Sequence, residues 1–153
     1  MPTNLYGPRD NFDLQTSHVL PALIRHFVEA VENGSSKLTL WGSGSPKREF
    51  LHVNDLAQAV LKTSDNYDSS MHLNIGTGSD LTIRELAGKV AAAAGFTGEI
   101  EWDTSKPDGT PQKVLDVSKI KALGWEPTIT LEEGIASTIA WFKKASAQGE
   151  VRK

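Results

Sequence analysis

The stretch LTLWGSGSPKREFLHVND, residues Leu38 to Asp55, decides how this sequence folds. Its composition predicts a strand, a turn rich in Gly, Ser and Pro, a second strand and the start of a helix. The turn brings two adjacent cations, Lys47 and Arg48, to the edge of the second strand, where a planar guanidinium is well placed to bind a phosphate. After Arg48 the alternation of residues predicts opposite faces for Phe50 and Leu51. Spacing alone also fits a plainer interpretation, an exposed hairpin that carries a solvated pair of charges.

Outward from this stretch, short strands alternate with helices. The helical spacing of apolar residues predicts helices over residues 21–31, 54–61, 83–94, 118–123 and 131–142. Two capping boxes, Thr82 with Glu85 and Thr130 with Glu133, mark the starts of the third and the last of these helices. Strands are expected over residues 3–6, 37–41, 71–75, 98–102 and 114–116. The sequence therefore predicts an α/β fold in which helices pack against small sheets.

A complete dinucleotide-binding fold is not expected. That fold opens with a strand, a glycine-rich turn and a helix, whereas the Gly-x-Gly candidates here begin at Gly42 and Gly76. A further strand follows the first candidate. The second follows a strand and precedes a helix, but Leu81 stands where the motif requires its third glycine. The N-terminal Rossmann dinucleotide turn is therefore missing from this sequence.

Composition and charge limit the classes of function that the sequence supports. The net charge is −3 and the isoelectric point is about 5.8, which argues against a nucleic-acid partner. No apolar run reaches the roughly 18 residues of a membrane span, and the first residues have no signal-peptide pattern. The absence of cysteine excludes disulfides and thiolate chemistry and fits a cytoplasmic protein. The four histidines include no pair three or four residues apart, so no metal site is expected.

Several segments together resemble the second half of the GDP-L-fucose synthases, a family of extended short-chain dehydrogenases/reductases. They cover almost the whole chain and are residues 2–8, 10–12, 17–23, 41–44, 48–53, 74–78, 82–86, 105–111 and 123–125. The sequence REFLHV at 48–53 is shared by many nucleotide-sugar epimerases and dehydratases. The sequences SHVLPAL at 17–23 and KPDGTP at 106–111 are much more specific to the fucose synthases.

The resemblance implies a two-step reaction, in which GDP-4-keto-6-deoxy-D-mannose is epimerised at two carbons beside its ketone and NADPH then reduces that ketone. The first half of the family supplies the glycine-rich turn, a reactive cysteine and a catalytic Ser, Tyr and Lys set. This sequence has none of these, because neither Tyr6 nor Tyr67 is followed by Lys four residues later. We therefore expect a fragment that lacks the N-terminal half and has no turnover of its own.

The resemblance assigns cofactor-side and catalytic roles. Pro2, Thr3, Asn4 and Leu5 match the segment that passes along the nicotinamide of NADP. His18 matches the histidine that acts as acid and base in epimerisation, close to the cofactor. An imidazole is suited to this role because it exchanges protons near neutral pH. Without the resemblance, His18 would be interpreted as a polar residue at a helix entrance.

Four residues match the substrate side of the family: His26, Trp41, Arg48 and Asp108. Arg48 matches the contact to the diphosphate, and Trp41 matches a substrate-side residue, although a tryptophan that ends a strand is also typical of a core. Asp108 lies in the loop that closes over the nucleotide, where it would accept from ribose hydroxyls or remain a solvated turn residue. His26 departs from the family, which has Lys or Arg there, and a neutral imidazole would weaken that contact.

We expect residues 1–145 to form the GDP-sugar-binding region, with the end of the cofactor domain at 1–33 and a polar tail at 146–153. The implied partners are the GDP-sugar, the N-terminal half and a second copy in a homodimer, with no nucleic acid and no membrane. The apolar faces of 2–6 and 21–31 would pack on the other half, so we expect them to be exposed. Two alternatives stay open, another nucleotide-sugar epimerase or dehydratase and a non-catalytic sugar-nucleotide-binding module.

Overall fold

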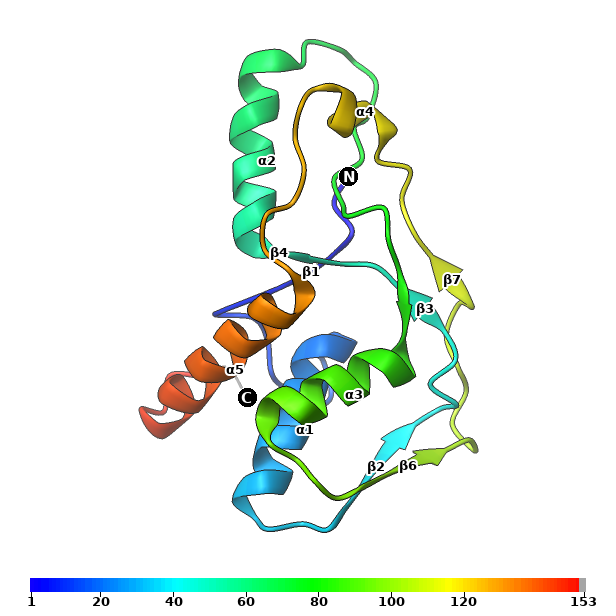
Figure 1. Cartoon of the computed structure of the whole chain (residues 1–153), viewed down its shortest axis with the longest axis vertical. Coiled ribbons are helices and arrows are strands. Elements are labelled where there is room, and N and C mark those ends of the chain that lie inside the picture. Colours follow the sequence, from blue (N-terminus) through cyan, green and yellow to red (C-terminus); the bar gives the residue numbers. More distant parts are fainter. Residues whose placement is uncertain (152–153) are drawn as a thin grey trace.

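The computed structural model describes residues 1–151, which form an α/β fold. Its helices are α1 (Val19–Glu32), α2 (Val53–Asn66), α3 (Ile83–Ala94), α4 (Ser118–Ala122) and α5 (Leu131–Ala147). Its strands are β1 (Asn4–Tyr6), β2 (Lys37–Trp41), β3 (Lys47–Arg48), β4 (Phe50–His52), β5 (Leu81–Thr82), β6 (Glu99–Asp103) and β7 (Gln112–Lys113). Figure 1 shows an elongated molecule, with α2 and α4 at one end and α1, α3 and α5 gathered toward the other.

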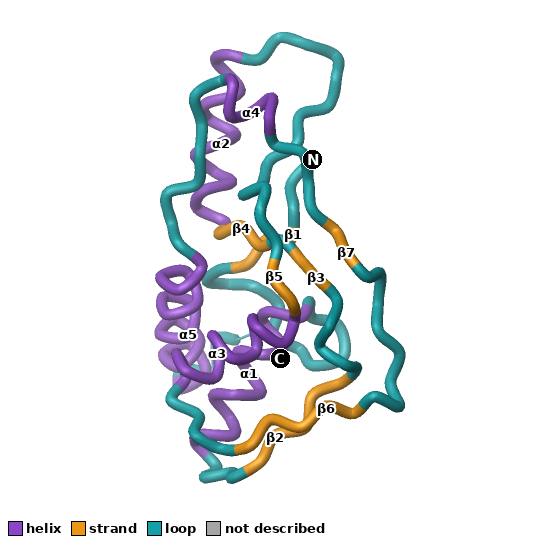
Figure 2. Tube along the Cα trace, turned by 45° about the vertical axis from the view of Figure 1, so that its right-hand side comes forward, coloured by secondary structure: helices purple, strands orange, loops and turns teal. Residues whose placement is uncertain are grey.

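The strands form three small sheets. β1 and β4 pair in parallel, with Asn4 opposite Phe50, and β2 and β6 pair in parallel, with Trp41 opposite Asp103. In the third sheet β3 lies between β5, which is antiparallel to it, and β7, which is parallel to it. Figure 2 shows this third sheet on the opposite side of the molecule from α5. The prediction of an α/β fold with small sheets and helices is confirmed.

Two hydrophobic cores hold the elements together. The larger core joins the apolar faces of α1, α3 and α5, where Phe27, Leu86 and Ile139 are buried. The smaller core lies under α2 and α4 and contains Ile120 and Trp125. The expectation that the helix over 21–31 would be exposed is therefore wrong, because its partners lie within this chain.

Helix α2, in contrast, leaves apolar side chains exposed. Val60 is 51% exposed and Leu61 is 62% exposed. Both residues follow the helical spacing that the sequence suggests for a buried stripe. Among the described residues, no helix is long and apolar enough to cross a membrane.

The stretch from Leu38 to Asp55 does not form a hairpin. β2 pairs with β6, and the expected second strand is interrupted at Glu49, so that β3 and β4 join different sheets. The predicted opposite faces of Phe50 and Leu51 are confirmed, since Phe50 packs in the larger core and Leu51 in the smaller one. Both faces of β4 are therefore buried, and the plain interpretation of a solvated hairpin is wrong.

Several local predictions need correction. α2 begins one residue earlier than expected, because the side chain of His52, and not that of Asn54, caps the helix by accepting from the backbone of Asn54. Residues 71–75 form no strand and contribute only a bridge between Ile75 and Pro2. The strand expected at 114–116 lies earlier, at β7. Both predicted capping boxes are confirmed.

The C-terminal segment differs from the polar tail expected from residue 146. α5 continues through Ala147, and Val151 packs against the larger core. Residues 152 and 153 of that expected tail lie outside the described residues. The domain boundaries at 33 and 145 stay predictions.

Candidate active site

Arg48 lies in the central strand of the three-stranded sheet, paired with Leu81 on one side and Lys113 on the other. Its Nη1 donates to the backbone carbonyls of Lys47, at 2.7 Å, and Thr110, at 2.6 Å. Among the described residues, Nε and Nη2 donate to no other group. These two nitrogens form one edge of the guanidinium fork, so the edge that suits a bidentate phosphate contact is free.

Residues 103–111, which we call the strap, run past this edge. Asp108 fastens the strap to the turn after β2, because its carboxylate accepts from the backbone N–H of Ser43, at 2.9 Å, and from the Ser43 hydroxyl, at 2.6 Å. These hydrogen bonds hold the pKa of Asp108 below its usual value. Gly42 has φ +81°, and a Cβ there would overlap the Asp108 carboxylate. The turn therefore needs glycine to accept this latch.

Gly109 keeps the free edge of Arg48 open. A Cβ at Gly109 would lie 3.2 Å from Nη2 of Arg48, which is closer than ordinary van der Waals contact. The backbone of the strap thus approaches the guanidinium without covering it.

Two cavities in this region share Val19, Trp41 and Ile83 in their linings. The smaller, of about 210 Å³, is lined by Arg48, Asp108 and Gly109 among others. The larger, of about 450 Å³, is mostly apolar and reaches His26. Trp41 lines both cavities. An apolar cavity next to one that contains the Arg48 guanidinium suits a ligand with a flat ring system and a phosphate group.

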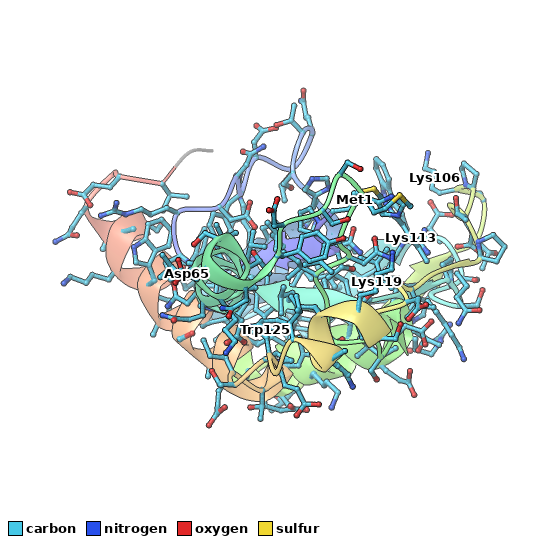
Figure 3. The ribbon with its side chains drawn as sticks, turned by 90° about the horizontal axis from the view of Figure 1, so that it is seen from above. Met1, Asp65, Lys106, Lys113, Lys119 and Trp125 are labelled. Atoms are coloured by element: carbon cyan, nitrogen blue, oxygen red, sulfur yellow. The ribbon has the colours of Figure 1, made fainter. Side chains whose placement is uncertain are left out.

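Trp41 is 76% exposed, so the alternative that it belongs to the core is wrong. The ammonium of Lys106, in the strap, lies 5.6 Å from the centre of the Trp41 ring, within the range of a cation–π contact. Figure 3 shows Lys106 and Lys113 on the same side of the molecule, away from α5. The open face of this site is therefore cationic and aromatic.

His26 projects from α1 toward the larger cavity and is half-buried. Burial lowers its pKa, an effect that Glu29 opposes and Arg25 reinforces. At neutral pH the imidazole is therefore uncharged, which fits a polar contact better than a phosphate contact.

A third cavity, of about 370 Å³, is lined by His18. It brings together Thr3, Asn4, Leu5 and His18, as expected for the cofactor side. Pro2 does not line it and pairs with Ile75 instead. His18 is the exposed N-terminal cap of α1 and makes no side-chain capping hydrogen bond, so its imidazole is available to a ligand. Its neighbour in the chain, Val19, lines the two cavities described above, whereas His18 lines only the third.

Sequence reasoning missed three residues of this site: Asp10, Ser43 and Gly109. Asp10 lines the cavity of His18, and burial raises its pKa while the Asn11 backbone and the nearby His18 oppose that rise. Asp10 could have been identified from the sequence, because it lies in one of the segments that resemble the GDP-L-fucose synthases. No local sequence pattern indicates Ser43, since its partner Asp108 is 65 residues away in the chain.

Tyr6 also lines the third cavity. Burial raises its pKa, with Asp55 and Glu132 adding to the effect, so its hydroxyl stays protonated at neutral pH. No cluster of three His, Cys, Asp or Glu suited to a metal ion occurs among residues 1–151.

The first half of the chain, residues 1–76, matches the NAD dependent epimerase/dehydratase family. The chain is 54% identical over 142 residues to the probable GDP-L-fucose synthase 1 of Oryza sativa subsp. japonica, a match that covers 93% of this chain and 43% of that protein. The chain thus spans less than half the length of this relative.

Solved structures agree with this similarity. A GDP-L-fucose synthetase from Naegleria fowleri bound to NADP superimposes with a TM-score of 0.91 at 35% identity, covering 99% of this chain and 47% of that one. A UDP-glucose 4-epimerase from Thermotoga maritima, with UDP-glucose, has a TM-score of 0.81 at 26% identity, covering 95% and 45%. The fold is therefore that of one part of a nucleotide-sugar enzyme.

Proposed function

We propose, from the match of residues 1–76 to the NAD dependent epimerase/dehydratase family, that the chain is the substrate-binding half of a GDP-L-fucose synthase. The observation that carries the proposal is the 54% identity to a GDP-L-fucose synthase over 93% of the chain. The complete enzyme would convert GDP-4-keto-6-deoxy-D-mannose to GDP-L-fucose by epimerisation and reduction. It would act in the cytoplasm as a homodimer.

The two cavities that Trp41 lines would hold the nucleotide. The free Nε and Nη2 edge of Arg48 supports a bidentate contact to the diphosphate, and exposed Trp41 would offer a flat apolar face to the ligand. His26, uncharged at neutral pH, would donate or accept a hydrogen bond there. Asp108 would close the strap through its hydrogen bonds to Ser43, and the remaining acceptor sites of its carboxylate would bind ribose hydroxyls.

The cavity at His18 would hold the nicotinamide end of NADPH, which supplies a hydride when bound. The polar side chains of Thr3 and Asn4, beside apolar Leu5, suit an amide-bearing ring. His18 would remove and return protons at the two carbons beside the ketone, since it lines this cavity and its imidazole makes no capping hydrogen bond. Asp10 lines the same cavity as His18.

The similarities also rank the alternatives. Identity is 54% to the GDP-L-fucose synthase of O. sativa but 26% to the UDP-glucose 4-epimerase, which favours a GDP-sugar over a UDP-sugar. The division into residues 1–145 for the GDP-sugar region, 1–33 for the end of the cofactor domain and a tail from 146 remains part of this proposal.

Nucleotide choice tests the proposal. Isothermal titration of the chain with GDP, UDP and dTDP should give the tightest binding for GDP. Tighter binding of UDP or dTDP would move the chain to another nucleotide-sugar enzyme, and binding of none of the three would overturn the proposal. NADPH consumption that depends on the GDP-4-keto sugar should be absent from the 153-residue chain alone, because the Ser, Tyr and Lys set is missing from it.

A further inference from the structure

Glu49 is a fully buried carboxylate that follows Arg48 directly in the chain. Its Oε1 accepts from the backbone N–H of Gly78 at 2.8 Å and from the Thr77 hydroxyl at 3.4 Å. Its Oε2 accepts from the backbone N–H of Leu115 at 2.9 Å. A buried charge is costly unless it is hydrogen-bonded, and both oxygens of this carboxylate are.

The three contacts lie at one end of the sheet that carries Arg48. Gly78 precedes β5 and Leu115 follows β7, while Glu49 follows β3. Each of these strands has only two residues, so the ladder itself contributes few hydrogen bonds. Figure 2 shows the three strands side by side. The Glu49 carboxylate therefore joins all three strands where their own pairing ends.

The Gly76-Thr77-Gly78 run is explained by this carboxylate. A Cβ at Gly76 would overlap Oε1 of Glu49, and Gly78 donates its N–H to the same oxygen. The run is thus a turn that binds an anion, as glycine-rich turns often are. The anion is a side chain of the chain itself and not a dinucleotide phosphate.

The backbone of Glu49 extends the connection to the His18 side of the site. Its carbonyl accepts from the Asn4 amide at 2.7 Å and from the Thr3 hydroxyl at 3.3 Å. One residue therefore ties the segment proposed for the cofactor to the strand that presents Arg48.

We propose that Glu49 is a positioning residue for the diphosphate site, which fixes the ends of β3, β5 and β7 so that the free edge of Arg48 faces the ligand. This inference rests on the proposed function, since it assumes that a nucleoside diphosphate binds at Arg48. Glu49→Gln tests it, because the amide keeps the length of the side chain but replaces one acceptor by a donor that faces a backbone N–H.

The chain offers a matched control in Asp55, which is 2% exposed. Its carboxylate accepts from the backbone N–H of Thr128 at 3.1 Å, from the Thr128 hydroxyl at 2.9 Å and from the backbone N–H of Ile129 at 3.0 Å. It thus resembles Glu49 in burial and hydrogen bonding, but it lines neither of the two cavities that Trp41 lines. Asp55→Asn should lower the melting temperature and leave GDP affinity within about twofold.

The decisive measurement is a double-mutant cycle on GDP affinity by titration calorimetry. Glu49→Gln should weaken GDP binding about tenfold, in the range of a lost charge-assisted contact. In an Arg48→Ala background the same change should have no further effect, since the residue it positions is gone. An equal loss with and without Arg48, or a similar loss in Asp55→Asn, would reduce Glu49 to general stability.

The inference about Glu49 stays testable even if the Glu49→Gln variant does not fold. If Glu49→Gln does not fold, Thr77→Val removes the longest of the three hydrogen bonds to the Glu49 carboxylate, together with the two contacts between the Thr77 hydroxyl and the backbone of Ser79. It should weaken GDP binding about twofold to threefold, again only while Arg48 is present. Unchanged affinity in Thr77→Val would then overturn the inference. Failure of the unaltered chain to bind GDP would instead overturn the proposed function.

Discussion

Replacing Arg48 with alanine removes two hydrogen bonds within the chain and the free guanidinium edge that we propose binds the diphosphate. Nη1 loses its contacts to the carbonyls of Lys47 and Thr110, and the free Nε and Nη2 edge is lost to the ligand. A hydrogen bond to a charged group contributes about 1.5–3 kcal/mol. Arg48→Ala should therefore weaken GDP binding roughly ten- to a hundredfold. NADPH binding to the complete enzyme should change much less, because Arg48 does not line the cavity at His18.

Two further variants separate geometry from charge. Arg48→Lys keeps the charge but cannot make a two-pronged contact, so it should restore only part of the affinity. Lys47→Ala removes the same charge one residue away, on an exposed side chain, and should cost less than about threefold because solvent and salt screen it. Titration calorimetry at low and high salt measures all three. Unchanged GDP affinity in Arg48→Ala, or an equal loss in Lys47→Ala, would refute the reasoning.

Three more outcomes are expected. Gly109→Ala places a Cβ 3.2 Å from Nη2 of Arg48. It should weaken GDP binding several-fold with little change in melting temperature. Unchanged affinity would show that the backbone of the strap moves away to make room for the methyl group. In the complete enzyme, His18→Gln should abolish exchange of solvent deuterium into the sugar while reduction survives better, and ordinary incorporation at both carbons by mass spectrometry would leave His18 a structural role. Burial lowers the pKa of both His26 and His52 below the usual 6.5, so the unfolded chain binds protons first as pH falls. The melting temperature should therefore decrease from pH 7.5 to pH 6, and a constant or rising value would contradict this.

Features fixed by neighbouring residues were predictable from the sequence. The bounds of β2 were predicted correctly, and both capping boxes form as the Thr-x-x-Glu spacing requires. α1 was recognised from its apolar stripe, but its partners were not, because an amphipathic face does not identify the surface that covers it. The same limit applies to α2, whose Val60 and Leu61 follow a helical stripe and remain exposed.

Pairings between distant residues were not predictable. Residues 71–75 have the composition of a strand, but the chain there pairs only through Ile75 with Pro2, so tertiary contacts override β-propensity. The expected hairpin failed for the same reason, since β2 finds its partner at residues 99–103 and not across the adjacent turn. The latch between Ser43 and Asp108 likewise depends on chain geometry that no local spacing encodes.

Arg48 and Glu49 show why this limit matters most at the site. In sequence they are adjacent opposite charges at a strand edge, a pattern typical of a solvated surface. In the structure Glu49 is fully buried and donors from two other segments surround it, whereas Arg48 keeps one edge of its fork free. A buried charge in a chain of ordinary composition is retained at some cost to stability. We infer that this cost is tolerated because the buried Glu49 carboxylate fixes the orientation of Arg48. A strand of two residues could not fix that orientation alone.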